Sequence, residues 1–222
     1  MALDHDAEGA VSAPERERLL GAFAELLAER GYEAVGIEAI CGRAGVDVGV
    51  FATHFGGDKE RCAAAAENAI LSEVVAAVGR SYSADRSEWD NVVACVKAIL
   101  DVMVANPGLA YLGYIGGRQM APPGVLEIYE AGHQMLEAML ERGQAYATSA
   151  NAPPRAALAA LGGAEAIIRR EIAAGRTAQL PRLLPDFVYS ATVPFLGQEE
   201  ALRLARQGRE LLTNSPGGLL SD

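Results

Sequence analysis

Residues 37–55 read IEAICGRAGVDVGVFATHF and predict two short helices joined by a tight turn. Apolar residues recur there at helical spacing and are expected to face one way. They are Ile37, Ile40, Ala44, Val46, Val48, Phe51 and Phe55. Gly45 suits the positive φ that ends a first helix, and Asp47 is placed to cap a second one. This layout is typical of a helix-turn-helix, whose second helix enters the major groove of DNA.

The flanking sequence extends this pattern on both sides. Residues 15–30 predict a longer amphipathic helix, and residues 54–60, HFGGDKE, close the motif before another helix capped by Asp58. Residues 14–61 together resemble the DNA-binding domain of the TetR (TetR/AcrR) family of bacterial transcriptional regulators. The resemblance implies a three-helix DNA-binding domain followed by a larger helical domain for ligand binding and dimerisation.

The remaining chain also favours helices, with no strand alternation or repeat. We expect an all-α fold of about nine helices, with a sharp break at Asn106-Pro107-Gly108 and a kink at Pro194. The expected organisation is a disordered tail at 1–13, a helix-turn-helix domain at 14–60, a ligand-binding and dimerisation domain at 61–214, and a flexible tail at 215–222.

Composition narrows the class of protein. The net charge of the 222 residues is −10, which argues against general affinity for nucleic acid or for anionic membranes. Three widely spaced cysteines form no metal-ligand motif and suggest reduced thiols. We see no signal peptide and no apolar run of about 20 residues, so we expect a cytoplasmic protein without a membrane partner.

The predicted DNA-facing surface is unusually poor in groups that bind DNA. Family members usually carry Thr or Ser where this chain has Gly36, Ser in place of Asp47, and Tyr in place of Ala52. Nine acidic and six basic residues between Pro14 and Arg61 give a net charge of −3. Candidate DNA contacts are Thr53 as the one polar reader of bases, Val48 and Val50 against thymine methyls, and Arg43, His54 and Lys59 against phosphates.

Three interpretations therefore stay open, of which the last is a purely structural helical dimer. The first is a ligand-responsive regulator, by expectation a repressor, that binds operator DNA as a homodimer. The second is a protein of the same fold with a degenerate DNA-binding face, which acts as a ligand-binding protein or an enzyme in the larger domain. The missing nucleophile–base pair and phosphate loop count against an enzyme, so no catalytic residue, metal or cofactor is assigned.

The larger domain offers a candidate ligand pocket between residues 109 and 139. The candidate ligand-binding residues are Tyr111, Tyr114, Met120, Tyr129 and His133. Glycines 113, 116 and 117 leave space on one helix, and an apolar or aromatic small ligand is expected. The alternative is that these side chains are ordinary core, and that His133 is solvated among Glu130 and Glu137.

Residues 156–172 and the helix after them are expected to form the homodimer interface. Small residues there permit close approach between helices, beside larger apolar ones such as Leu158 and Ile167. The partner helix is expected to contribute Phe187, Val188, Val193, Phe195 and Leu196.

Overall fold

A computed structural model describes residues 13–116, 123–144 and 152–213, and within them it contains nine α-helices, a π-helical turn and a 3-10 helix. In chain order these are α1 (Ala13–Arg30), α2 (Ile37–Ala44), α3 (Val48–Phe55), α4 (Lys59–Ser81), α5 (Glu88–Ala105), α6 (Pro107–Tyr111), η1 (Leu112–Gly116), α8 (Pro123–Gln144), α9 (Ala156–Ala173), η2 (Thr177–Leu183) and α10 (Leu184–Thr213). The all-α prediction is confirmed. The two predicted tails fall outside the described residues, apart from Ala13, which begins α1.

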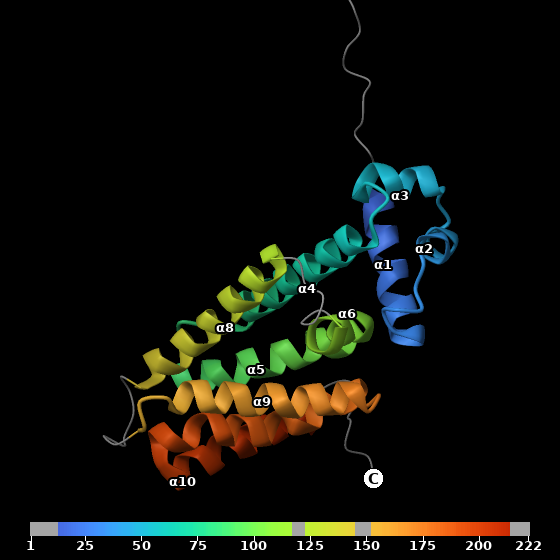
Figure 1. The fold of residues 1–222 in the computed structure, drawn as a ribbon. Helices are drawn as coiled ribbons and strands as arrows, with labels where there is room; N and C mark the ends of the chain where they lie inside the picture. Colours follow the sequence, from blue (N-terminus) through green and yellow to red (C-terminus); the bar gives the residue numbers. More distant parts are fainter. Residues whose placement is uncertain (1–12, 117–122, 145–151, 214–222) are drawn as a thin grey trace, which may run out of the picture.

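Helices α1, α2 and α3 form a small N-terminal unit at one end of the molecule (Figure 1). Its core is built on Phe23, Ile40 and Phe51, none of which is exposed. Gly45 has a φ of 65° and ends α2 as predicted, because only glycine adopts this conformation without strain. Asp58 also caps α4 as predicted, and its Oδ1 accepts a hydrogen bond from the Glu60 amide at 2.8 Å.

Two local predictions in this unit differ from the structure in detail. Asp47 occupies the N-cap position of α3, but its side chain makes no capping hydrogen bond; its backbone carbonyl accepts from the amides of Val50 at 3.0 Å and Phe51 at 3.4 Å. Val48 was expected on the buried face and is instead 48% exposed. As the first residue of α3, it lies before the turn that packs Phe51 against the core.

Helix α4 links the N-terminal unit to the rest of the chain. Its first turns bury Cys62 and Ala66 in the N-terminal core, and its later turns pack along α5 and α8. Among the described helices, α4 is the only single helix long and apolar enough to cross a membrane. Helix α5 together with α6 and η1 also passes this test if the bent pair is counted as one span. The contacts of α4 with α1, α5 and α8 account for its apolar character in this fold.

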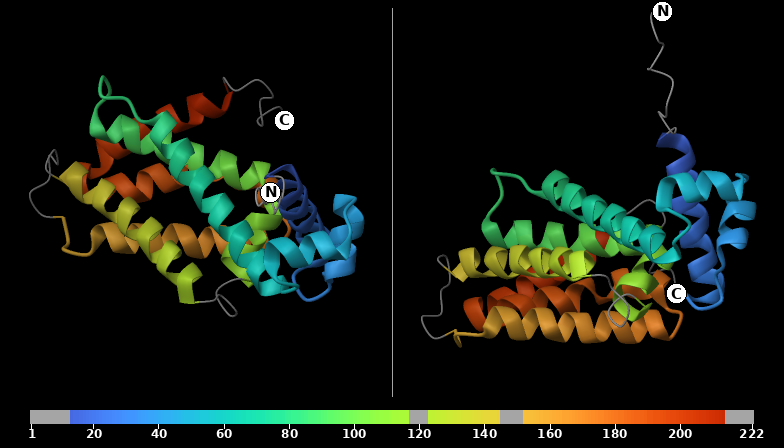
Figure 2. Two further views of the ribbon diagram at one scale, coloured as in Figure 1. Left: turned by 90° about the horizontal axis from the view of Figure 1, so that it is seen from above. Right: turned by 45° about the horizontal axis from the view of Figure 1, so that its top comes forward.

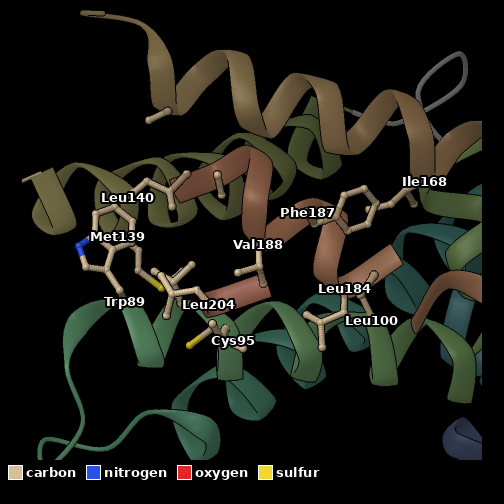
Figure 3. Close-up of a cluster of buried hydrophobic side chains, with 14 of the residues drawn as sticks. Trp89, Cys95, Leu100, Met139, Leu140, Ile168, Leu184, Phe187, Val188 and Leu204 are labelled. Atoms are coloured by element: carbon tan, nitrogen blue, oxygen red, sulfur yellow. The ribbon is translucent and has the colours of Figure 1, made fainter. Parts of the chain in front are cut away.

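The larger unit is a stack of helices seen from the side in Figure 1 and from above in Figure 2. Helices α4 and α8 form one layer, α5 lies in the middle, and α9 and α10 form the opposite layer. The core fills the space between α5 and α10, where Leu100, Leu184 and Val188 are almost fully buried (Figure 3). This close-packed core holds α5, α8, α9 and α10 in fixed positions relative to one another.

Both predicted breaks are present, one of them at a different residue. The chain bends by 105° between α5 and α6 at Asn106, as the Asn-Pro-Gly sequence predicts. Near the C-terminus the non-helical residue inside α10 is Gly197, with φ 75° and ψ 176°, whereas Pro194 lies within a helical stretch. Glycine rather than proline therefore makes this kink.

Candidate functional site

The outward face of α3 is small and mostly apolar. Val48, Gly49, Ala52 and Thr53 are exposed, while Val50 is half-buried against the N-terminal core. The Thr53 hydroxyl donates to the Gly49 carbonyl at 2.9 Å, so only its oxygen is left to accept a bond from a base. This face suits contact with thymine methyls better than hydrogen-bonded recognition of bases.

Arg43, a predicted DNA contact, is held by two carboxylates of α1. Its guanidinium donates to Glu29 at 2.9 Å and to Glu25 at 3.0 Å. Hydrogen bonding to Arg43 lowers the pKa of Glu29 and, in return, raises that of the guanidinium. Arg43 thus ties α2 to α1, and any phosphate contact must compete with this pairing.

Lys59 also serves an internal contact. Its ammonium donates to the carbonyls of Tyr32 and Val35, both at 3.1 Å, and lies 4.2 Å from the centre of the Tyr32 ring. It therefore holds the α1–α2 loop against the start of α4. The Nε2 atom of His54 is buried without a hydrogen-bond partner, so this nitrogen does not face solvent. DNA contacts by Arg43, His54 and Lys59 stay predictions.

The structure brings two other arginines to the end of α3. The Arg16 guanidinium lies 5.9 Å from the ring centre of Phe55, the last residue of α3. Arg61 follows the turn after α3, is 73% exposed, and reaches Asp58 only at 3.9 Å. Sequence reasoning missed Arg16 because nothing in the chain places the start of α1 beside the end of α3. Arg61 was counted only in the net charge, although it follows α3 by six residues.

A cavity of about 190 Å³ lies inside the larger unit. Helices α4, α5, α6, α8, α9 and α10 and the π-helical turn η1 supply its walls, which are mainly apolar. Figure 3 shows five of its lining side chains within the core. They are Leu100, Met139, Leu140, Ile168 and Phe187.

Two of the five predicted ligand residues, Tyr114 and His133, line this cavity. Tyr111 does not; its hydroxyl lies near Gly31, at 3.7 Å from where a Cβ on that glycine would stand. Met120 lies outside the described residues, as does the side chain of Tyr129. Gly113 lines the cavity within the π-helical turn, as expected of a glycine that leaves space.

The cavity carries a small number of polar groups. The Nδ1 atom of His133 lies 3.1 Å from Oε1 of Glu165 on α9, so the histidine pairs across helices rather than with its own-helix neighbours Glu130 or Glu137. Burial raises the pKa of the Tyr114 hydroxyl. Glu67 of α4 is 5% exposed, its Oε2 has no hydrogen-bond partner, and burial raises its pKa to about 7.

Comparison with known proteins agrees with this architecture. Residues 19–66 match the model of a family described as bacterial regulatory proteins, tetR family. These residues form a TetR-family domain. No curated protein matches the chain. The match spans most of α1, all of α2 and α3, and the start of α4.

Solved structures of TetR-type regulators share the fold of most of the chain. The fatty acid degradation regulator FadR from Bacillus halodurans is 16% identical, with a TM-score of 0.71 over 85% of this chain and 98% of its own. A gamma-butyrolactone receptor, an ArpA-like protein, is 17% identical with a TM-score of 0.63 over 89% and 97%. FadR from Bacillus subtilis in complex with stearoyl-CoA is 16% identical with a TM-score of 0.60 over 82% and 98%. At these identities the likeness shows the TetR fold.

No metal centre accompanies the TetR fold in the part of the chain that the structure describes, where no group of three metal-ligating side chains comes together. Its three cysteines are buried and free, as the odd count suggested. The cavity and the outward face of α3 are therefore the two places where function is best sought.

Proposed function

We propose that this protein is a ligand-responsive transcriptional regulator, a repressor that binds operator DNA as a homodimer in the cytoplasm. The observation that carries the proposal is the double role of α4. Its residues Cys62 and Ala66 belong to the core of the TetR domain, and Glu67, Ile70 and Val74, directly after them, line the cavity. A ligand that shifts α4 therefore moves the helix-turn-helix with it.

The known structures support a small-molecule ligand. Among proteins of this fold, one is a gamma-butyrolactone receptor and another was crystallised with stearoyl-CoA. The cavity of this chain has the apolar lining and sparse polar groups of a ligand site. We take Tyr114 and His133 as ligand-binding residues.

The exposed face of α9 supports homodimer formation. Leu158 and Ile167 are 44% and 41% exposed, and the glycines between them, Gly162 and Gly163, have open space where a Cβ would stand. Such a face lets a second helix approach closely. Of the five residues expected from the partner helix, Phe187, Val188, Phe195 and Leu196 are buried inside the chain's own core, whereas Val193 is half-buried.

The same surfaces define the kind of DNA recognition proposed. In this proposal Val48 and Ala52 contact thymine methyls, Thr53 accepts one hydrogen bond, and Arg16 and Arg61 bind phosphates near the end of α3. A second candidate function, a ligand-binding protein that has lost DNA binding, is favoured by one observation. Both Arg43 and Lys59 are engaged in internal contacts instead of facing solvent freely.

A DNA-binding titration separates the two functions. A fluorescent fragment of the gene's own upstream region is titrated with protein, beside a scrambled fragment of the same length. The regulator requires tighter binding to the upstream fragment than to the scrambled one. Equal binding to both fragments would favour the ligand-binding protein instead.

A further inference from the structure

Glu67 is the one described acid in this cavity whose carboxylate oxygen is both buried and unpartnered. It is only 5% exposed and lies among apolar residues of α4, with Ile70 and Leu71 beside it in the cavity wall. Burying a carboxylate without hydrogen bonds is costly, which is why burial raises its pKa to about 7. A buried, unpartnered carboxylate oxygen in a cavity wall indicates a ligand group that pairs with it.

The other polar groups of the cavity do not supply that partner. His133 is paired with Glu165 at 3.1 Å, and Glu67 makes no hydrogen bond to either through its buried oxygen. No lysine or arginine is among the described residues that line the cavity. Arg169 acts on Tyr114 instead, where its charge lowers the pKa of the hydroxyl against the larger opposite effects of burial and of Glu165.

We propose that the cavity binds a small apolar amine whose ammonium group donates to the carboxylate of Glu67. This rests on the proposed ligand-binding function and names the chemical class of the ligand. An ammonium satisfies the unpartnered oxygen and offsets the charge of the two lining acids, Glu67 and Glu165. An anionic ligand would instead face both carboxylates across an apolar wall.

The size of the cavity limits the apolar part of this amine. A cavity of about 150 Å³ holds a benzene ring. At about 190 Å³, this one has room for one ring with a short arm. The arm would place its ammonium at Glu67 on α4 while the ring lies against Leu136 and Met139 of α8.

Three ring compounds that differ only in their head group test the proposal. Phenethylamine carries an ammonium, 3-phenylpropanoate a carboxylate, and ethylbenzene no polar group. Their binding to the purified full-length protein at neutral pH is measured by titration calorimetry, directly or by competition. We expect phenethylamine to bind at least about tenfold more tightly than 3-phenylpropanoate.

Two glutamate variants on the same helix localise the effect. Glu67→Gln keeps the shape of the side chain and removes its charge, so phenethylamine binding should weaken at least about tenfold while ethylbenzene binding stays within about threefold. Glu73→Gln is the matched control, because Glu73 is exposed on α4 and pairs at the surface with Arg80. It should leave the binding of all three compounds unchanged.

The outcomes separate this proposal from the proposed function. Equal or tighter binding of 3-phenylpropanoate, or an unchanged phenethylamine affinity in Glu67→Gln, would overturn the amine proposal and leave a ligand-binding regulator intact. Binding of ethylbenzene alone would do the same. Binding of none of the three would overturn the amine proposal and the proposed ligand-binding cavity together. The ranking of the compounds on the unmodified protein decides the matter even if Glu67→Gln folds poorly.

Discussion

A Cβ atom on Gly108 would stand 1.7 Å from the carbonyl oxygen of Ala24, so α6 and α1 approach each other backbone to backbone at this glycine. The amide nitrogen of Ala28 lies 3.1 Å from the same point. Helix α6 leads directly into the π-helical turn that lines the cavity. Gly108 thus forms a second connection, besides α4, between the cavity and the TetR domain.

Gly108→Ala should be destabilising, because the backbone of α1 cannot move aside as a flexible side chain would. We expect the free energy of unfolding to fall by about 1–3 kcal/mol or more. Urea unfolding at fixed protein concentration measures this. The matched control is Gly79→Ala, where the Cβ meets nothing within 4 Å on a helix surface, so stability should rise by about 0.5–1 kcal/mol. Equal effects of the two substitutions would contradict the close approach.

Glu67 should make the protein less stable as pH rises. Its pKa is about 7 in the folded state and 4.5 as the reference value, so the unfolded chain releases its proton first. The resulting loss begins near pH 4.5, is complete above pH 7, and amounts to at most about 3 kcal/mol. Tyr114, His133 and Glu165 are the other titratable groups lining this cavity.

Unfolding of the wild type and of Glu67→Gln at pH 5 and pH 8 isolates this effect. The stability of the variant relative to the wild type should increase between the two pH values. A difference that does not change with pH would show that Glu67 ionises freely in the folded protein.

The proposed dimer face can be tested by charge. If α9 packs against a second copy of the chain, the double variant Leu158→Asp, Ile167→Asp would bury two unpaired carboxylates in the interface. The variant should therefore be shifted towards the monomer. Analytical ultracentrifugation over a range of concentrations measures the shift. Val75→Asp serves as control, since Val75 is 47% exposed on α4, and it should leave the assembly unchanged. A double variant that stays dimeric would place the interface elsewhere.

Arg16 and Arg61 should each contribute one phosphate contact. Replacing either by Ala should weaken DNA binding at all sequences alike and reduce the slope of log affinity against log salt by about 0.9. Arg80→Ala is the control, because Arg80 pairs with Glu73 in the later part of α4. Unchanged salt slopes in Arg16→Ala and Arg61→Ala would remove both residues from the DNA interface.

Much of the fold was predictable because it depends on local sequence. The positive φ of Gly45, the cap by Asp58 and the bend at Asn106 follow from residue types at their own positions. The contacts of Arg43 and Lys59 were not predictable, since their partners lie 14 to 27 residues away. The close approach of Gly108 to α1 was not predictable either, because the sequence around it indicated only a helix break.

The candidate site was predictable only in part. Tyr114 and His133 follow from aromatic and polar residues at helical spacing, and both line the cavity. Glu67 was missed although a signal was present. Counted from Ala63, Glu67, Ile70 and Val74 stand at positions i+4, i+7 and i+11 and therefore share one face of α4. A glutamate on this apolar face is not expected to be solvated.

The central claim is that an intact helix-turn-helix is joined to a ligand cavity in one regulator. Binding of the purified protein to a fluorescent fragment of its own promoter region, titrated from low to physiological salt, tests this most directly. The account predicts binding that is selective over a scrambled fragment and that weakens steeply with salt. No selective binding even at low salt would contradict it and would leave a ligand-binding protein that no longer recognises DNA.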